Sequence, residues 1–205
     1  MKQQWDEAVR LLGGVATDAA DDLARRYAES HRAYHNATHI EAVLREARTL
    51  GELTGEDRAI LTLAICAHDV VYDARPGDDE RASAQWAREK LSEASVDEVY
   101  IARVEQLILA TLKHESDDEL AHLLLDADLS ILGADPDIYD GYAAAVRKEY
   151  ASVPDDLWQQ GRAAVLGRLL DREDLFVTPQ AKAHWDSKAR ANMARELEGL
   201  PYIEK

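Results

Sequence analysis

Cysteine, proline and glycine are all scarce in this sequence. Its 205 residues include one cysteine, five prolines and ten glycines. The single cysteine, Cys66, excludes an internal disulfide framework, and its apolar neighbours predict a small buried side chain. Because few prolines and glycines interrupt a chain rich in alanine and leucine, long helices are favoured over sheets.

Long apolar runs and positive charge are lacking as well. No stretch of about 20 apolar residues could span a bilayer, and residues 1–6 show no signal-peptide core, so we expect a cytoplasmic protein without a membrane partner. The 24 Lys and Arg residues against 40 Asp and Glu residues give a net charge of −16. Nucleic-acid binding is therefore not expected, because it needs clustered cations. A small anionic substrate is still compatible, since a metal ion reverses the local potential.

Helical periodicity runs through the chain. Hydrophobic residues make up 46% and charged residues 31%, as in soluble globular proteins, and the length suffices for one core. Apolar residues recur at helical spacing, and no segment alternates as a strand would. We therefore predict an all-α, single-domain fold of about nine helices over residues 1–205. The helix over residues 57–71 is the most apolar and is expected at the centre.

The stretch 63–73 carries His68 and Asp69 side by side into an apolar run. An imidazole buried beside a carboxylate is costly unless both are paired, and a divalent metal ion pairs with both. Neighbours on a helix point about 100° apart, so these two share an ion only if it lies off the helix. His39 lies upstream and an aspartate near 128 downstream. Two imidazoles and two carboxylates suit a divalent ion with positions left for water and substrate.

The order of these residues resembles the HD-domain superfamily of metal-dependent phosphohydrolases. The motifs Tyr-His-Asn-Ala-Thr-His at 34–39 and Ala-Asp-Leu-Ser at 127–130 also resemble the catalytic cores of cyclic-nucleotide phosphodiesterases. A fuller pattern, similar to a bacterial group of predicted HD phosphohydrolases, includes residues 32–36, 68–73, 79–84 and 126–129. The resemblance covers roughly residues 30–150 and implies an HD-domain helical fold, with helices of 151–205 packing on this core.

The resemblance implies four metal ligands, which are His39, His68, Asp69 and Asp128. Asp126 competes with Asp128 for the last position, and we prefer Asp128 because the superfamily's aspartate follows Ala and precedes Leu. The two aspartates lie about 200° apart on a helix, so we do not expect both to face the ion. The expected cofactor is Mn²⁺, Mg²⁺, Fe²⁺ or Zn²⁺, and whether one ion or two bind stays open.

Three residues are predicted to take part in catalysis: His35, Glu80 and Asp69. His35 matches the phosphodiesterase histidine that protonates the leaving oxygen, and it shares a helix face with His39 if the helix extends that far. Otherwise it caps the helix or hydrogen-bonds the core. Asn36 or Thr38 is the predicted helix cap. Glu80 is expected to orient the nucleophilic water or a ligand, or else to be a carboxylate in the first turn of a helix.

Arg32, Lys113 and His114 are the candidate contacts for a substrate phosphate. The phosphodiesterase-like proteins have a further histidine soon after the His-Asp pair, whereas Tyr72 and Asp73 occupy that neighbourhood here. His114 is therefore also a candidate ligand of a second metal ion.

The predicted function is a metal-dependent phosphohydrolase that cleaves a small phosphoester through a metal-activated water, with a nucleotide among the candidate substrates. One alternative is a di-iron HD-type oxygenase, which needs additional histidines between the His-Asp pair and the last aspartate, and His114 and His122 are the only two in that interval. A second is a non-catalytic, nucleotide-binding regulatory module, and a third is a plain helical interaction protein. The expected partner is a small phosphorylated substrate, and homodimer formation stays open.

Overall fold

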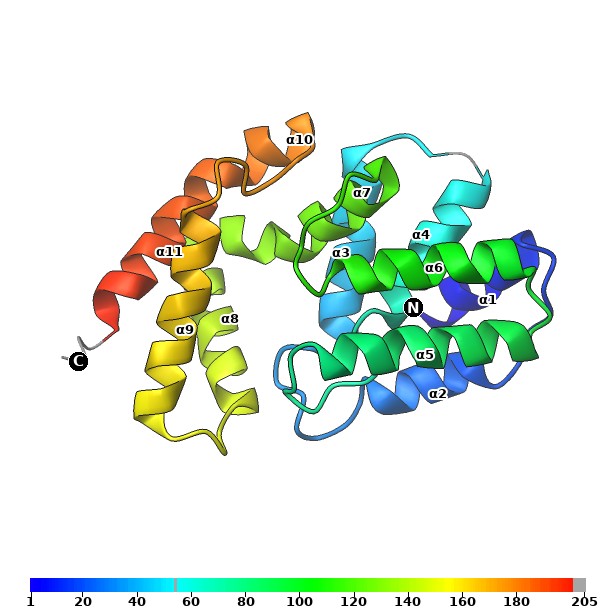
Figure 1. Cartoon of the computed structure of the whole chain (residues 1–205), viewed down its shortest axis with the longest axis horizontal. Coiled ribbons are helices and arrows are strands. Elements are labelled where there is room, and N and C mark those ends of the chain that lie inside the picture. Colours follow the sequence, from blue (N-terminus) through cyan, green and yellow to red (C-terminus); the bar gives the residue numbers. More distant parts are fainter. Residues whose placement is uncertain (54, 201–205) are drawn as a thin grey trace. The chain divides into compact units, whose positions relative to one another are not determined.

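Every regular element of the computed structural model is helical within residues 1–53 and 55–200, which are the residues it describes (Figure 1). The all-α prediction is confirmed. Ten α-helices of eight residues or more lie in this part of the chain, close to the expected nine, and a single helical turn, α10, precedes a π-helical segment. The elements are α1 (Lys2–Leu11), α2 (Ala19–Arg26), α3 (Ala37–Leu50), α4 (Gly55–Ala67), α5 (Asp78–Glu93), α6 (Glu98–Ala110), α7 (Glu119–Asp128), η1 (Leu129–Gly133), α8 (Pro136–Glu149), α9 (Asp155–Leu170), α10 (Pro179–Ala181), η2 (Lys182–Asp186) and α11 (Ser187–Gly199).

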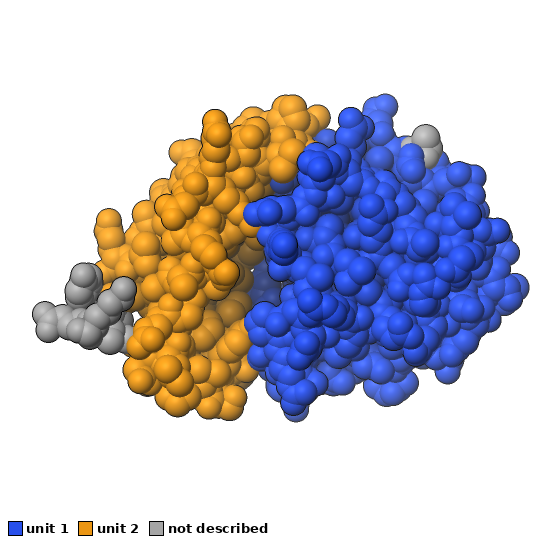
Figure 2. Space-filling model, viewed as in Figure 1, with its two compact units in different colours: residues 1–127 blue, residues 128–205 orange. Residues whose placement is uncertain are grey.

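The chain divides into two compact units, which Figure 2 colours separately: unit 1 is Met1–Ala127 and unit 2 is Asp128–Lys205. The expected single domain over residues 1–205, with a core at about 30–150, stays a prediction. No helix among the described residues is long and apolar enough to cross a membrane. The cytoplasmic location and the oligomeric state also stay predictions.

Helix α4 is the centre of unit 1, as its apolar sequence predicts. It packs against α1, α3, α5 and α6, and its side chains from Leu63 to Ala67 are at most 1% exposed. Each leucine or isoleucine buried here stabilises the fold by about 1.5–3 kcal/mol. Cys66 is among them, which confirms its prediction as a small buried side chain, and burial raises the pKa of its thiol to about 12.

A tryptophan pair and one aspartate join helices α1, α2 and α5 of unit 1. The rings of Trp5 on α1 and Trp86 on α5 lie 5.5 Å apart, and both side chains are buried. The indole nitrogen of Trp86 donates a hydrogen bond to Asp22 Oδ2 on α2, 2.8 Å away. Because a buried indole N–H needs an acceptor, this bond fixes how α2 packs on α5.

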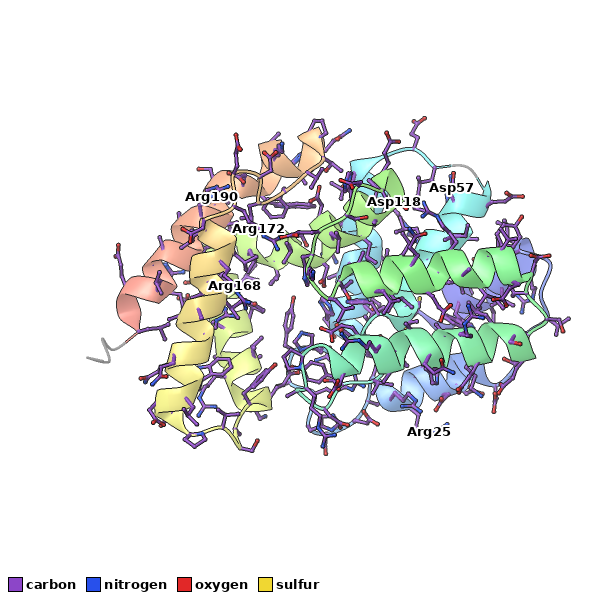
Figure 3. The ribbon with its side chains drawn as sticks, viewed as in Figure 1. Arg25, Asp57, Asp118, Arg168, Arg172 and Arg190 are labelled. Atoms are coloured by element: carbon purple, nitrogen blue, oxygen red, sulfur yellow. The ribbon has the colours of Figure 1, made fainter. Side chains whose placement is uncertain are left out.

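Unit 2 is held together by arginines of α9 and α11. Arg162 donates from two nitrogens to the carboxylate of Glu196, at 2.7 and 2.9 Å, and Tyr139 donates its hydroxyl to the same group. Arg190 on α11 donates to carbonyl oxygens at the end of α9, including those of Leu170 and Arg172 (Figure 3). These bonds satisfy carbonyls that have no partner within the helix.

Candidate metal centre

His68 and Asp69 lie in the turn that follows α4, because the helix ends at Ala67. The prediction of a helix through residue 71 is therefore wrong at its end. The last carbonyls of a helix lack partners within it. Here the Tyr27 hydroxyl donates to the carbonyl oxygen of Cys66 at 3.0 Å, and His68 Nδ1 pairs with that of Ile65 at 2.8 Å. Side chains thus replace the next helical turn and release His68 and Asp69 from helical geometry.

Three potential ligand atoms meet beyond this turn: Nε2 of His39, Nε2 of His68 and Oδ2 of Asp69. The two Nε2 atoms are 3.4 Å apart, and Asp69 Oδ2 lies 3.4 Å from His39 Nε2 and 3.0 Å from His68 Nε2. His39 comes from α3, and both imidazoles are buried. The structure therefore brings together three of the four predicted metal ligands.

The spacing of these three atoms fits one divalent ion. Nitrogen and oxygen ligands bind such an ion at about 2.0–2.2 Å, so two ligands that subtend 90–110° at the ion lie about 3.0–3.4 Å apart. All three measured separations fall between 3.0 and 3.4 Å. The chemistry fits too, because an imidazole and carboxylate set suits Mn²⁺, Fe²⁺ and Zn²⁺.

The Asp69 carboxyl is held in its charged form. Burial alone would raise its pKa, but the charge of His68 and hydrogen bonds from His39 and His68 lower it well below its ordinary value. Its side chain is only 18% exposed. A carboxylate that stays ionised inside the protein binds a cation without first releasing a proton.

His35 lies beside the candidate metal centre, in the segment that precedes α3. Helix α3 begins at Ala37, and the Asn36 side chain accepts a hydrogen bond from the backbone N–H of Thr38 at 2.9 Å, so Asn36 is the cap and His35 precedes the helix. The shared helix face with His39 depended on a helix that extends to His35, and this condition is not met. The two rings nevertheless lie 5.7 Å apart, and the His35 ring stacks on Tyr72 at 4.3 Å.

Arg32 bonds to the protein itself through its whole guanidinium group. Its Nη1 donates to the carbonyl oxygens of Asp69 at 2.7 Å and His35 at 3.1 Å, and its Nη2 donates to that of Val70 at 2.9 Å. Its Nε donates to Glu29 Oε2 at 3.0 Å, and the side chain is 1% exposed. The predicted phosphate contact of Arg32 stays a prediction that these bonds do not favour.

Two residues of α5 hold the segment after Asp69, a role that sequence analysis did not assign. Ser83 Oγ accepts from the Val71 N–H at 3.1 Å and pairs with its carbonyl at 3.3 Å. Asp79 Oδ2 accepts from the N–H groups of Asp73 and Arg75, at 3.0 and 2.7 Å. Their spacing of four residues places both on one face of α5. The sequence signal for this role is an Asp and a Ser four positions apart, directly after the loop that follows the His-Asp pair.

Glu80 lies in the first turn of α5, where its Oε2 accepts from the backbone N–H of Gly77 at 2.5 Å. This contact matches the helix-start alternative, and its expected role toward water stays a prediction. Lys113 is exposed beyond the end of α6, and His114 has a left-handed backbone with φ 51°. Their substrate contacts are not tested by these positions. His122 Nε2 pairs with the carbonyl oxygen of Ser116 at 2.7 Å.

The choice between the two aspartates of α7 stays open. Asp126 is 1% exposed and belongs to unit 1, which also holds the three meeting ligands. Asp128 is half-buried and is the first residue of unit 2, whereas the three ligands belong to unit 1. Asp128 remains the predicted fourth ligand on the strength of its sequence pattern.

Comparison of the chain with protein-family models, with curated proteins and with solved structures finds no match. The resemblance to the HD-domain superfamily therefore stays a prediction carried by the sequence motifs. What the structure adds is a group of two histidines and one aspartate that is able to hold a metal ion.

Proposed function

We propose that this chain is a metal-dependent phosphohydrolase of the HD-domain type that cleaves a small phosphoester, with nucleotides among the candidate substrates. The observation that carries the proposal is the meeting of His39, His68 and Asp69 at ligand spacing. They come from two distant segments, in the order that the superfamily motif requires. An interaction protein without catalysis has no need of two buried histidines against a half-buried carboxylate.

In this proposal His39, His68 and Asp69 hold the ion, with Asp128 as the fourth ligand. A divalent ion bound there supplies Lewis-acid chemistry, because it lowers the pKa of a water molecule and polarises a phosphoryl oxygen. His68 offers Nε2 to the ion because its Nδ1 pairs with the Ile65 carbonyl. A bond to the other ring nitrogen is how proteins fix the tautomer of a metal-binding histidine.

The chain's own groups then move protons. The lowered pKa keeps Asp69 ionised, so it can bind the ion as a carboxylate, and in this proposal it is also the group that accepts the proton of the attacking water. His35 donates a proton to the departing oxygen, and its position supports this role because the ring lies beside His39 and stacks on Tyr72. Stacking limits the rotation of the imidazole, so a proton on the ring keeps a fixed direction. Glu80 orients the water or a ligand, and Lys113 and His114 contact the phosphate.

The alternative of a di-iron oxygenase receives less support. It would need His122 as a ligand, but the ring nitrogen Nε2 of His122 pairs with the Ser116 carbonyl 2.7 Å away, in the loop before α7. Metal-assisted phosphoester hydrolysis needs at least one ion, and the three meeting residues suit that requirement. Nothing in the contacts favours a regulatory module over an enzyme.

The proposal is tested by phosphate release in the absence of oxygen. The purified protein is supplied with Mn²⁺ and assayed against nucleoside monophosphates, cyclic nucleotides and sugar phosphates. We expect release of phosphate or of a phosphomonoester by the wild type and by Asp117→Ala, whose side chain is exposed. Asp69→Ala should show no turnover while keeping its helix content. Full activity in Asp69→Ala, or substrate oxidation with oxygen uptake and no phosphate release, would contradict the proposal.

A further inference from the structure

One guanidinium group joins the two segments that carry the proposed chemistry. Nη1 of Arg32 donates both to the carbonyl oxygen of His35, just before α3, and to that of Asp69, just after α4. Nη2 donates to the next carbonyl, that of Val70. Residues more than 30 positions apart in the sequence are thereby fixed to one planar group.

The surroundings of this guanidinium keep it rigid. Its side chain is 1% exposed, and the rings of Tyr27 and Tyr72 lie 5.0 and 5.7 Å from its central carbon. Glu29 accepts from the remaining nitrogen, Nε, and supplies the compensating charge. Arginine stays charged at any working pH, so burial is tolerated only because each nitrogen has an acceptor.

The bonds of Arg32 bear directly on the position of the site residues. Asp69 and His35 are held by their own backbone carbonyls, so neither backbone can shift without breaking a bond to the same nitrogen. The distance between the carboxylate ligand and the proposed proton donor is set by this shared contact. The guanidinium of Arg32 has N–H donors and no acceptor, so Arg32 cannot itself bind the ion.

We propose that Arg32 is a positioning residue of the metal centre: it fixes Asp69 and His35 relative to each other and contacts neither the ion nor the substrate. This inference rests on the proposed function, because it assumes that a divalent ion binds at His39, His68 and Asp69. Replacing a residue that orients metal ligands typically lowers the metal affinity roughly 10- to 100-fold.

The direct test is Arg32→Lys with Co²⁺ as the probe. A lysine offers a point charge on a flexible chain and cannot bond a row of carbonyls as a planar fork does. We expect the Co²⁺ affinity to fall roughly 10- to 100-fold, with an altered visible absorption spectrum of the bound ion. The matched control is Arg45→Lys, which makes the same replacement on α3, where the side chain is 69% exposed. It should bind Co²⁺ as the wild type does.

A second control separates positioning from general loss of stability. Val104 is fully buried on α6, which carries none of the three ligands, so Val104→Ala lowers the unfolding midpoint without touching Arg32. We expect this variant to keep wild-type Co²⁺ affinity and spectrum. Wild-type binding by Arg32→Lys, or an equal loss of affinity in Val104→Ala, would overturn the positioning role.

Glu29→Gln keeps the inference testable if Arg32→Lys does not fold. The Glu29 side chain is 40% exposed, so its replacement disturbs the core little, yet it removes the charge that orients the guanidinium. We expect weaker Co²⁺ binding than in the wild type, and unchanged binding would overturn the role of Arg32. Failure of the wild type itself to bind Co²⁺ would instead overturn the proposed function and this inference together.

Discussion

The ring nitrogen Nδ1 of His68 pairs with the carbonyl oxygen of Ile65, 2.8 Å away, at the end of α4. A carbonyl only accepts hydrogen bonds, so Nδ1 carries a ring proton, and Nε2 is the nitrogen that offers a lone pair to a metal ion when the ring is neutral. Nε2 lies 3.0 Å from Asp69 Oδ2 and 3.4 Å from His39 Nε2. One bond therefore completes the helix end and prepares the nitrogen that faces the other ligands.

The tautomer of His68 is the first prediction. Long-range ¹H–¹⁵N NMR spectra should show a proton on Nδ1 both before and after Zn²⁺ is added. The Nε2 resonance should shift when the ion binds, because that nitrogen is the proposed ligand. A Zn²⁺-bound His68 that keeps its proton on Nε2 would contradict the assignment.

The sequence predicts the ligand types and their order but not their geometry. Its apolar pattern continues through Val70, which is fully buried, so the pattern gives no sign that α4 ends at Ala67. The end depends on the hydroxyl of Tyr27, which lies 39 positions away from its acceptor. Such distant partners are settled by tertiary packing, which overrides local helical preference.

The start of α3 shows the opposite case. Asn36 is a typical helix cap, its amide oxygen accepts from the Thr38 N–H, and the sequence names it as one of two candidates. Choosing it would have placed His35 outside the helix. The stacking of the His35 ring on Tyr72 could not be foreseen, since this contact depends on the turn after α4.

Ser83 gives a second prediction, on stability. Its buried hydroxyl bonds both the N–H and the carbonyl of Val71, so Ser83→Ala leaves backbone groups without these partners. We expect the unfolding free energy to fall by about 1–3 kcal/mol in urea titrations. Ser92→Ala, at an exposed position of the same helix, should change it by less than about 0.5 kcal/mol. Equal effects in the two variants would contradict the role of Ser83.

Two glycines of unit 2 give a third prediction: an alanine at one should destabilise the protein, and an alanine at the other should stabilise it. A Cβ on Gly133 would lie 2.5 Å from Trp185 Cβ and 2.7 Å from its Cα, so backbone must move to admit it. Gly133→Ala should therefore destabilise the protein by about 1–3 kcal/mol. A Cβ on Gly141, within α8, meets nothing within 4 Å, and Gly141→Ala should stabilise by about 0.5–1 kcal/mol. Thermal unfolding of both variants checks the two signs.

Glu196 gives a fourth prediction, on pH. Burial raises the pKa of its carboxyl, but hydrogen bonding and charge from Arg162 outweigh burial and lower it below 4.5. A lowered pKa stabilises the folded state above the unfolded pKa, and this contribution is lost as pH falls through the folded value. Glu196→Gln should therefore cost about 3 kcal/mol at pH 7, because Arg162 is left buried without its counter-charge.

The difference between wild type and Glu196→Gln should shrink as pH falls through the lowered pKa of the folded wild-type carboxyl, where that carboxyl also loses its charge. Urea unfolding of both proteins between about pH 7 and pH 3 measures it. A difference that grows toward acid pH would contradict the ion pair with Arg162.

The most direct test of the metal centre is the metal content of the wild type and of Asp69→Ala after incubation with Mn²⁺ or Zn²⁺ and removal of free ion. We expect near-stoichiometric metal in the wild type. Asp69→Ala should lose it, because the carboxylate that meets His39 and His68 is gone, while its circular dichroism spectrum stays helical. A wild type that retains no metal, or an Asp69→Ala variant that retains as much as the wild type, would contradict the account.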